Sequence, residues 1–201
     1  MSSLTAPSTE GAAEAAARFA AGAPADVHYA VVDTPVGKVV AARTERGLAR
    51  LAYEDFNGGL DRVLDQLAQR LSPRIIEGPA KLDDVRRELD EYFDGRRTAF
   101  DLPLDLSYVK GSFGRRLLQA CARIPFGEVS TYRAMATAAG SPNAVRAAGN
   151  ALGANPIPIV VPCHRILRTG GGLGGYTGGI ERKEALLRIE GITPTTPRRA
   201  S

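Results

Sequence analysis

Cysteine and histidine are scarce in this 201-residue chain, which contains only two of each. Two thiols are too few for a disulfide framework, and a reducing compartment would keep both Cys121 and Cys163 unpaired. A tetrahedral zinc site needs four well-spaced ligands, and His28 lies far along the sequence from His164, which follows Cys163. We therefore expect no disulfide, no bound metal and no other cofactor.

Long hydrophobic runs are also absent. No stretch approaches the roughly 20 uninterrupted apolar residues that cross a bilayer, and residues 1–26 lack the basic and then apolar order of a signal peptide. This segment is rich in Ala, Ser, Thr, Gly and Pro, so we expect a disordered tail there and a second tail at residues 193–201. The protein is expected to be cytoplasmic and to have no contact with a membrane.

Acidic residues are scarce in only one half of the chain. Residues 1–107 carry 13 Lys and Arg against 18 Asp and Glu, whereas residues 108–201 carry 13 against 4. The net charge of +4 therefore combines an acidic first half with a strongly basic second half. Nucleic acid is the partner that this asymmetry favours for the second half, although a solvated basic surface without a partner would give the same counts.

Short β-rich runs and two amphipathic segments make up the first half. Residues 27–55 contain apolar runs separated by Pro and Gly turn signals, which predicts a small antiparallel sheet. Residues 60–71 and 82–95 have apolar side chains at helical spacing, and a Pro or Gly breaker closes each segment. We predict an α/β fold of the α+β kind, in which residues 27–107 form a small N-terminal supporting domain.

Helices dominate the predicted C-terminal domain, residues 108–192. Within residues 112–124, Leu117, Leu118 and Cys121 fall on one apolar side of a predicted helix. A cysteine in such a stripe behaves as a small packed hydrophobe. We therefore expect Cys121 to be a core residue.

Two further short helices are predicted at residues 131–140 and 143–155. Ser141, followed by Pro142, has the residue types of an N-cap and a first helical turn for the second of these helices. Two short helices joined by a tight turn are typical of a helix-turn-helix, although any helical hairpin gives this pattern. Small residues surround the single long cation Arg146, so the second helix suits either a nucleic-acid groove or a neighbouring helix.

The stretch VVPCHRIL, residues 160–167, places Cys163 next to His164. A thiol reacts as the thiolate, which requires a nearby base, cation or helix N-terminus. Adjacent side chains point in different directions on a strand or a helix, so a direct pair needs a turn or a bridging water. Pro162 predicts that a buried strand formed by residues 157–161 ends just before Cys163. A lone cysteine here is more often a core residue, and a papain-like hydrolase does not fit because no histidine follows His164.

Several segments, in order and spacing, carry a resemblance to one family. NPIPIVVPCHRIL, preceded by PFGEVSTYRAMATAAGSPNAVRAAG and followed by GGYTGGIERKEALLRIEG, is similar to the O6-alkylguanine-DNA alkyltransferases, or methylated-DNA-protein-cysteine methyltransferases. A weaker likeness covers TPVGKVVAARTERGLARLAYED and LDEYFDGRRTAFDLPLDL in the first half. The resemblance implies DNA repair by direct damage reversal, in which a cysteine takes the alkyl group from O6 of guanine. It leaves open whether O4-alkylthymine is also a substrate.

The resemblance implies a stoichiometric transferase in which Cys163 keeps the alkyl group and each molecule acts once. It assigns His164 as the base towards Cys163 through a water, and Glu190 as the residue that orients and charge-stabilises His164. This follows the general logic of nucleophile, base and orienting group. Asn155 matches the family asparagine that helps to hold the site. Tyr132 matches the tyrosine that helps to extrude the nucleotide and protonates the departing guanine oxygen.

The implied contacts with DNA lie on the same segments. Arg146 matches the arginine that enters the base stack when a nucleotide is flipped out. The resemblance implies a minor-groove approach, with Ser141 as a phosphate contact and Tyr176 and Thr177 in the wall of the substrate pocket. The expected partner is double-stranded DNA that contains O6-alkylguanine. We expect a monomer, and the sequence leaves cooperative binding on DNA open.

The sequence also departs from the family pattern. Gly153 and Ala154 stand where many members carry a basic or polar residue, which bears on DNA affinity, and Leu118 stands where an aromatic residue is often found. Two rival functions remain. A non-catalytic binder of damaged DNA would not need Cys163, and a regulator would change its DNA affinity when Cys163 is modified, although nothing suggests a separate regulatory DNA-binding module.

Overall fold

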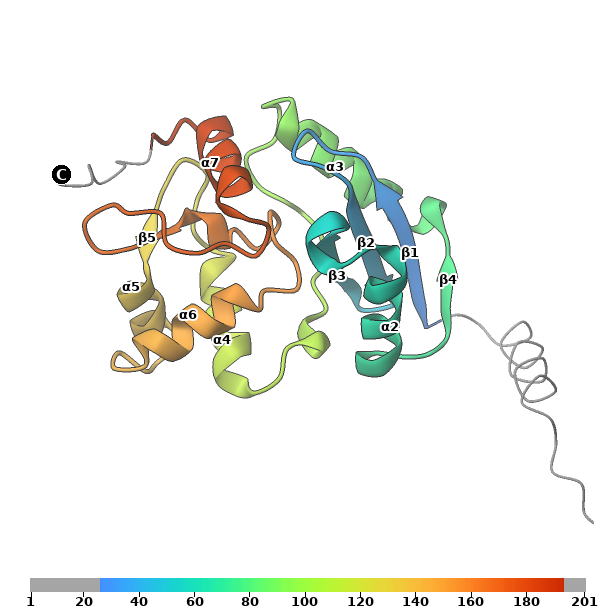
Figure 1. Ribbon diagram of the computed structural model, residues 1–201, viewed down its shortest axis with the longest axis horizontal. Helices are drawn as coiled ribbons and strands as arrows, with labels where there is room; N and C mark the ends of the chain where they lie inside the picture. The colour runs from blue at the N-terminus through green and yellow to red at the C-terminus, as the bar shows by residue number, and fades with distance from the viewer. Residues whose placement is uncertain (1–25, 194–201) are drawn as a thin grey trace, which may run out of the picture.

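The computed structural model describes residues 26–193 and places a sheet-containing part beside a helical part (Figure 1). This arrangement confirms the predicted mixed fold of a small sheet with helices followed by a mostly helical half. The predicted tails at residues 1–26 and 193–201 lie outside the described residues, apart from Asp26 and Thr193. No helix within the described range is long and apolar enough to cross a membrane.

The predicted antiparallel sheet consists of β1 (Val27–Val32), β2 (Val39–Thr44) and β3 (Gly47–Tyr53). A short strand that the sequence pattern did not predict, β4 (Ile75–Glu77), pairs in parallel with β1 and gives the order β3-β2-β1-β4. Every residue of β3 is buried although β3 forms an edge of the sheet. The Leu48 N–H of this edge donates to the Pro103 carbonyl and the Leu51 N–H donates to the Pro156 carbonyl, which hinders open strand pairing there.

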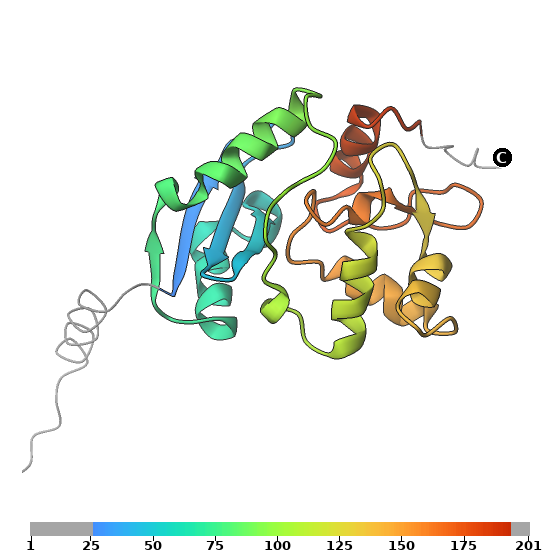
Figure 2. The same ribbon diagram turned by 180° about the vertical axis from the view of Figure 1, so that it is seen from behind.

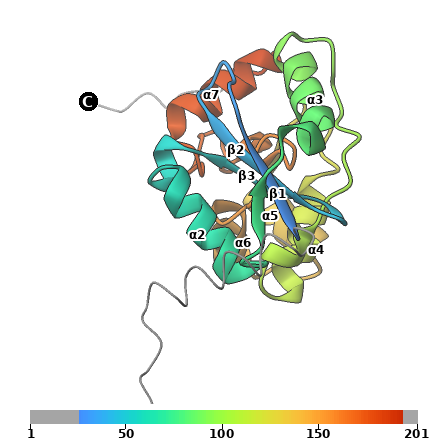
Figure 3. The same ribbon diagram turned by 90° about the vertical axis from the view of Figure 1, so that its right-hand side faces the viewer.

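Two helices cover opposite faces of this sheet. Helix α2 (Leu60–Arg70) packs on one face through Val63 and Leu67, and α3 (Asp83–Phe93) packs on the other through Leu89 and Tyr92. Figure 3 shows the two helices on either side of the strands. Short 3-10 helices complete this part of the chain: η1 (Asp55–Asn57), η2 (Pro79–Leu82) and η3 (Leu106–Tyr108).

The helical part is built around α4, which packs against α5 and α6 (Figure 2). Cys121, the last residue of α4, is fully buried, which confirms the predicted core position. The remaining elements are a pair of two-residue parallel strands, a 3-10 helix and a C-terminal helix. The bounds are α4 (Ser112–Cys121), β5 (Ser130–Thr131), α5 (Tyr132–Ala138), α6 (Val145–Gly153), η4 (Cys163–Arg165), β6 (Ile166–Leu167) and α7 (Ile180–Ile189).

The two parts share one hydrophobic core. A single cluster of buried residues runs from the α3 face of the sheet into α4, α5, α6 and α7. The backbone joins the parts as well, because the Leu51 N–H of β3 donates to the carbonyl oxygen of Pro156 at 2.8 Å. The sheet therefore supports the chain segment that leads to Cys163.

Ser141 does not cap α6, contrary to the expectation from sequence. Gly140 has a positive φ of 77°, its N–H donates to the Thr137 carbonyl, and the Ser141 N–H donates to the Ala136 carbonyl. These two bonds form a Schellman motif that ends α5. A separate turn follows, and α6 begins only at Val145, without a side-chain cap.

The expected strand at residues 157–161 is also wrong. These residues form consecutive turns, and Ile159 has a φ of 72°, the only positive φ of a residue other than glycine in the described range. Three prolines within residues 156–162 cannot donate to a strand ladder. A β-branched residue in the left-handed region is strained, so its surroundings must hold it there. Cys163 therefore begins η4 (Cys163–Arg165) after a turn.

Candidate active site

Asn155 shapes the turn that carries Cys163. Its side chain is buried, and Oδ1 accepts a hydrogen bond from the Ile157 N–H at 3.0 Å. Its amide Nδ2 donates to the Val161 carbonyl at 2.8 Å and to Cys163 Sγ at 3.1 Å. One side chain thus fixes the backbone and gives the sulfur a hydrogen-bond donor, which favours the thiolate form.

Cys163 lies at a pocket of about 490 Å³ and is 5% exposed. The wall of this pocket brings together η1 of the sheet part, α5, α6 and the loop before α7. Two glycines of α6 line the pocket: a Cβ at Gly149 would lie 3.9 Å from the Tyr132 ring, and one at Gly153 would meet nothing within 4 Å. The lining consists of Phe56, Tyr132, Gly149, Leu152, Gly153, Cys163, Arg168, Gly175, Tyr176 and Thr177.

Glu190, directly after α7, is the centre of a buried cluster of polar groups. Its Oε1 accepts hydrogen bonds from His164 Nε2, Arg165 Nη2 and the Tyr92 hydroxyl, each at 2.8 Å. Its Oε2 accepts from Arg165 Nε at 2.7 Å and from the Gly127 N–H at 3.5 Å. The structure thus brings Glu190 and His164, two residues singled out in the sequence, into direct contact.

The contact with Glu190 determines the tautomer of His164. A carboxylate only accepts hydrogen bonds, so His164 Nε2 carries the proton and Nδ1 keeps the free lone pair of a neutral imidazole. Nδ1 is buried and has no hydrogen-bond partner among residues 26–193. This nitrogen is therefore available to accept a proton through a bridging water.

The pKa values in the cluster favour a charged carboxylate beside a neutral imidazole. Burial raises the pKa of Glu190, but hydrogen bonds from His164 and Arg165 outweigh this effect and hold the pKa at about 2. Burial lowers the pKa of His164 despite the opposing influence of Glu190. A neutral imidazole is the form that can act as a base near neutral pH.

The thiol of Cys163 is subject to opposing influences. Burial raises its pKa, whereas the hydrogen bond from Asn155 and the charge of Lys183 act in the opposite direction. Lys183 is itself fully buried, and its Nζ donates to the carbonyls of Ile166, at 2.6 Å, and Leu173. Burial lowers the pKa of Lys183 to about 8. The resting thiol is protonated and needs a base.

Tyr132, which was predicted to act in catalysis and DNA contact, and the predicted pocket residues Tyr176 and Thr177 all line the cavity at Cys163. Burial raises the pKa of the Tyr132 phenol, so this hydroxyl carries its proton at neutral pH. The Tyr176 and Tyr53 hydroxyls lie 2.9 Å apart, which ties the pocket wall to β3. The Thr177 hydroxyl donates to the Gly153 carbonyl at 3.2 Å, linking the loop to α6.

Arg146 and Ser141 lie outside the pocket. Arg146 is on the exposed side of α6, while Ala148 and Leu152 bury the opposite side of that helix. Ser141 is half-buried in the turn between α5 and α6. Helix α6 therefore carries both Arg146 and part of the pocket lining, but Arg146 does not itself line the pocket. Any joint action requires a ligand that contacts both.

Among the residues near the site to which the sequence analysis assigned no role, Arg165, Tyr92 and Lys183 make buried polar contacts there. Arg165 stands directly after His164 in the motif, so its charge beside a buried cysteine was a usable signal. Tyr92 and Lys183 sit in ordinary amphipathic helix patterns, and only their burial and contacts distinguish them. No group of three or more His, Cys, Asp or Glu in residues 26–193 could hold a metal ion.

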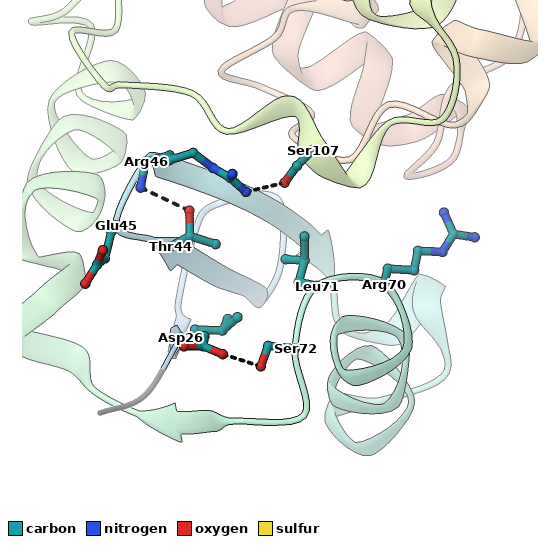
Figure 4. A pocket seen from close by; sticks show the side chains of 9 residues that line it. Asp26, Thr44, Glu45, Arg46, Arg70, Leu71, Ser72 and Ser107 are labelled. Atoms are coloured by element: carbon teal, nitrogen blue, oxygen red, sulfur yellow. Dashed lines mark hydrogen bonds between the residues drawn. The ribbon is translucent and has the colours of Figure 1, made fainter. Parts of the chain in front are cut away.

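A second pocket, of about 480 Å³, lies at the edge of the sheet part and has a different character. Several of its polar groups pair with each other, as Figure 4 shows: Ser72 donates to Asp26, the Arg46 side chain donates to Ser107, and the Arg46 N–H donates to Thr44. No cysteine or histidine lines it. It therefore has no nucleophile and base pair to compare with Cys163 and His164.

Comparison with known proteins identifies the family. Residues 27–106 match the family model described as 6-O-methylguanine DNA methyltransferase, ribonuclease-like domain, and residues 112–192 match the model of the DNA binding domain of the same family. The chain belongs to the 6-O-methylguanine DNA methyltransferase family. The resemblance carried by the sequence motifs is therefore confirmed.

Known members of this family are similar to this chain over most of their own length. The methylated-DNA-protein-cysteine methyltransferase of Mycolicibacterium paratuberculosis is 39% identical over 165 residues, which cover 82% of this chain and 92% of the relative. The crystal structure of the Mycobacterium tuberculosis O6-methylguanine methyltransferase has a TM-score of 0.70 at 35% identity and covers 84% of this chain and 96% of its own. A Mycobacterium tuberculosis OGT structure in complex with DNA has a TM-score of 0.69 at 36% identity, with coverages of 81% and 92%.

Proposed function

We propose that this protein repairs DNA by taking the alkyl group from O6 of an alkylated guanine onto Cys163, once per molecule. The observation that carries the proposal is the placement of Cys163 at the pocket, with Asn155 on its sulfur and the His164 and Glu190 pair behind it. Family membership supports the same reaction. The proposal includes O4-alkylthymine as a second substrate to be tested.

The transfer is a single displacement at carbon. His164 Nδ1 removes the thiol proton of Cys163 through a water, and Glu190 stabilises the imidazolium that results. The sulfur lone pair then forms the bond to the alkyl carbon while the bond from that carbon to O6 breaks, and its electron pair leaves with guanine. Tyr132 donates a proton to the departing guanine, which makes it a better leaving group. The thioether product is stable, so the protein is consumed.

The substrate must leave the base stack before it can reach Cys163. Flipping a nucleotide costs a few kcal/mol, and we assign Arg146 to fill the space that the base leaves. The small residues of α6 support a close approach to the minor groove, and Ser141 is assigned to a phosphate of the backbone. The basic charge of residues 108–201 supports duplex DNA as the partner.

The remaining parts of the proposal concern organisation. We assign residues 27–107 to a supporting domain and residues 108–192 to the domain that binds DNA and accepts the alkyl group. The protein is proposed to act as a monomer. A cytoplasmic location is proposed because both cysteines are free, as a reducing compartment would keep them.

The deciding experiment locates a labelled methyl group after the reaction. The protein is mixed with duplex DNA that contains one O6-methylguanine with an isotopic label, digested, and mapped by mass spectrometry. We expect the label on Cys163, at no more than one methyl per molecule. Tight binding to the lesion without label would instead support a non-catalytic damage binder, and a methyl-dependent change in affinity for one particular sequence would support a regulator.

A further inference from the structure

Tyr92 reaches the candidate active site from the other part of the molecule. It lies on α3, which covers the sheet, and its side chain is fully buried. Its hydroxyl donates to Glu190 Oε1 at 2.8 Å, and the same oxygen is bonded to His164 Nε2 at 2.8 Å. The phenol and the imidazole therefore compete for one carboxylate oxygen.

We propose that Tyr92 is a positioning residue of the transfer reaction, which acts through Glu190 to keep His164 oriented and neutral. The proposal rests on the proposed function, because it names the residue that controls the base in that reaction. It also gives the sheet part a direct influence on the chemistry of Cys163, in addition to its role in supporting the fold.

Packing alone does not require a hydroxyl at this position. The Tyr92 ring contacts Phe93, Phe100 and Phe126 with ring centroids 5.2, 5.3 and 6.1 Å away, so an aromatic ring without a hydroxyl would fill the same space. A buried hydroxyl is costly unless it is hydrogen-bonded. Here its partner is a buried charge, and hydrogen bonds to charged groups are the stronger kind.

The charged surroundings of Glu190 and His164 set the direction of the effect. Arg165 donates to both oxygens of Glu190, and the charges of Arg165 and Lys183 oppose protonation of His164. Glu190 is the group that favours the imidazolium. A hydrogen bond from Tyr92 withdraws charge from Oε1 and so weakens this pull.

Replacing Tyr92 by phenylalanine therefore has a defined consequence. The freed lone pair of Glu190 interacts more strongly with His164, the pKa of His164 rises, and a larger fraction of His164 is protonated at a given pH. We expect the acid limb of the transfer rate against pH to move to higher pH by about half to one unit. Transfer should fall about threefold to tenfold on that limb and change little on the plateau above it.

Tyr108, the last residue of η3, packs against the sheet and provides a matched control. It is also a buried tyrosine, and its hydroxyl donates to a side-chain oxygen, Gln66 Oε1 at 3.4 Å, in the core cluster on the α2 face of the sheet. Tyr108→Phe removes a buried hydroxyl without touching Glu190. Its pH profile should coincide with that of the wild type, whereas the profile of Tyr92→Phe should not.

A second measurement does not depend on transfer. The chain contains only two histidines, so the imidazole resonances of His164 and His28 can be followed separately by NMR as the pH is changed. In Tyr92→Phe we expect the midpoint of the His164 titration to rise.

The outcomes separate this inference from the proposed function. A raised His164 midpoint together with a shifted acid limb supports the positioning role. Profiles and midpoints that coincide with those of the wild type overturn it, as does a His164 that never titrates above the acid unfolding of either protein. If the wild type transfers no methyl group, the proposed function fails, and the NMR midpoints still decide whether Tyr92 controls His164.

Discussion

Helix α4 and the 3-10 helix η4 each contain one buried free cysteine, and the surroundings of the two sulfur atoms differ. Cys121 lies among apolar side chains, and no side-chain donor to its sulfur occurs within residues 26–193. Cys163 has an amide donor, a nearby buried lysine and a pocket that opens beside it. Burial raises the pKa of both thiols. Burial therefore does not distinguish a structural cysteine from a reactive one.

What distinguishes the two regions is whether polar groups are buried together with the sulfur. A buried polar group must be hydrogen-bonded or it destabilises the fold. Near Cys163 these bonds include the one between Glu190 and His164, the residue that we propose as the base. Cys121 instead belongs to the apolar core cluster, which stabilises the fold.

The largest expected effect comes from exchanging one cysteine at a time. Cys163→Ala should abolish methyl transfer, because no other thiol lines the pocket, while binding to duplex DNA should persist. Cys121→Ala should transfer normally and lose only about 1–2 kcal/mol in the free energy of unfolding. Labelled transfer and a DNA binding titration measure both variants. Transfer retained by Cys163→Ala would refute the assignment of the acceptor.

The second largest expected effect comes from removing the buried negative charge of Glu190. Glu190→Gln should slow transfer about a hundredfold or more and destabilise the fold at pH 7 by about 3–5 kcal/mol, because Arg165 loses its buried partner. The stability that ionised Glu190 contributes is fully present above its ordinary pKa of 4.5 and is lost as the pH falls towards about 2. The difference between wild type and variant should therefore shrink below pH 4.5.

Urea unfolding at several pH values measures this change, and single-turnover transfer measures the rate. A variant that equals the wild type in stability at pH 7 would show that the cluster around Glu190 contributes nothing net. The polar cluster near Cys163 and the apolar surroundings of Cys121 could then no longer be compared by their contributions to the free energy of unfolding.

The smallest effect concerns access to the pocket. Arg146→Ala should slow transfer from duplex DNA about tenfold. The proposed role of the Arg146 side chain is to offset part of the few kcal/mol that base flipping costs, and the variant loses this contribution. Transfer from the free O6-methylguanine base should not change, because this substrate needs no flipping. Arg62→Ala on α2, an exposed arginine of the sheet part, is the control. An equal loss on both substrates would place Arg146 in the chemistry instead.

Local patterns were enough to predict much of the fold. Alternating and helical apolar spacing gave β1 to β3, α2, α3 and the burial of Cys121, because each pattern is repeated within one element. The strand β4 was missed since it has three residues and pairs with β1 across a long stretch of chain. The apolar residues at 157–161 match the pattern of a buried strand, which is why the sequence predicts one there. The neighbouring prolines, which cannot donate to a strand ladder, prevent it.

The candidate site was predictable only as far as its motif extends. Cys163, His164 and Asn155 lie within one short stretch, and the resemblance supplied Glu190. The contacts of Tyr92 and Lys183 depend on how distant elements pack, which no local pattern encodes. Ser141 shows the same limit on a small scale. Its N–H donates to the Ala136 carbonyl in the turn that ends α5, and its side chain does not cap α6.

Glu190 is hydrogen-bonded to residues that the ribosome adds to the chain much earlier. Its partner Tyr92 precedes it by 98 positions and its partner Gly127 by 63. A growing polypeptide on the ribosome contains Cys163 and His164 well before Glu190 has been added. Such an intermediate lacks the carboxylate to which we assign the orientation of His164. On the proposed mechanism, competence for repair therefore arises late in biosynthesis, after Tyr92 and the sheet part have been synthesised.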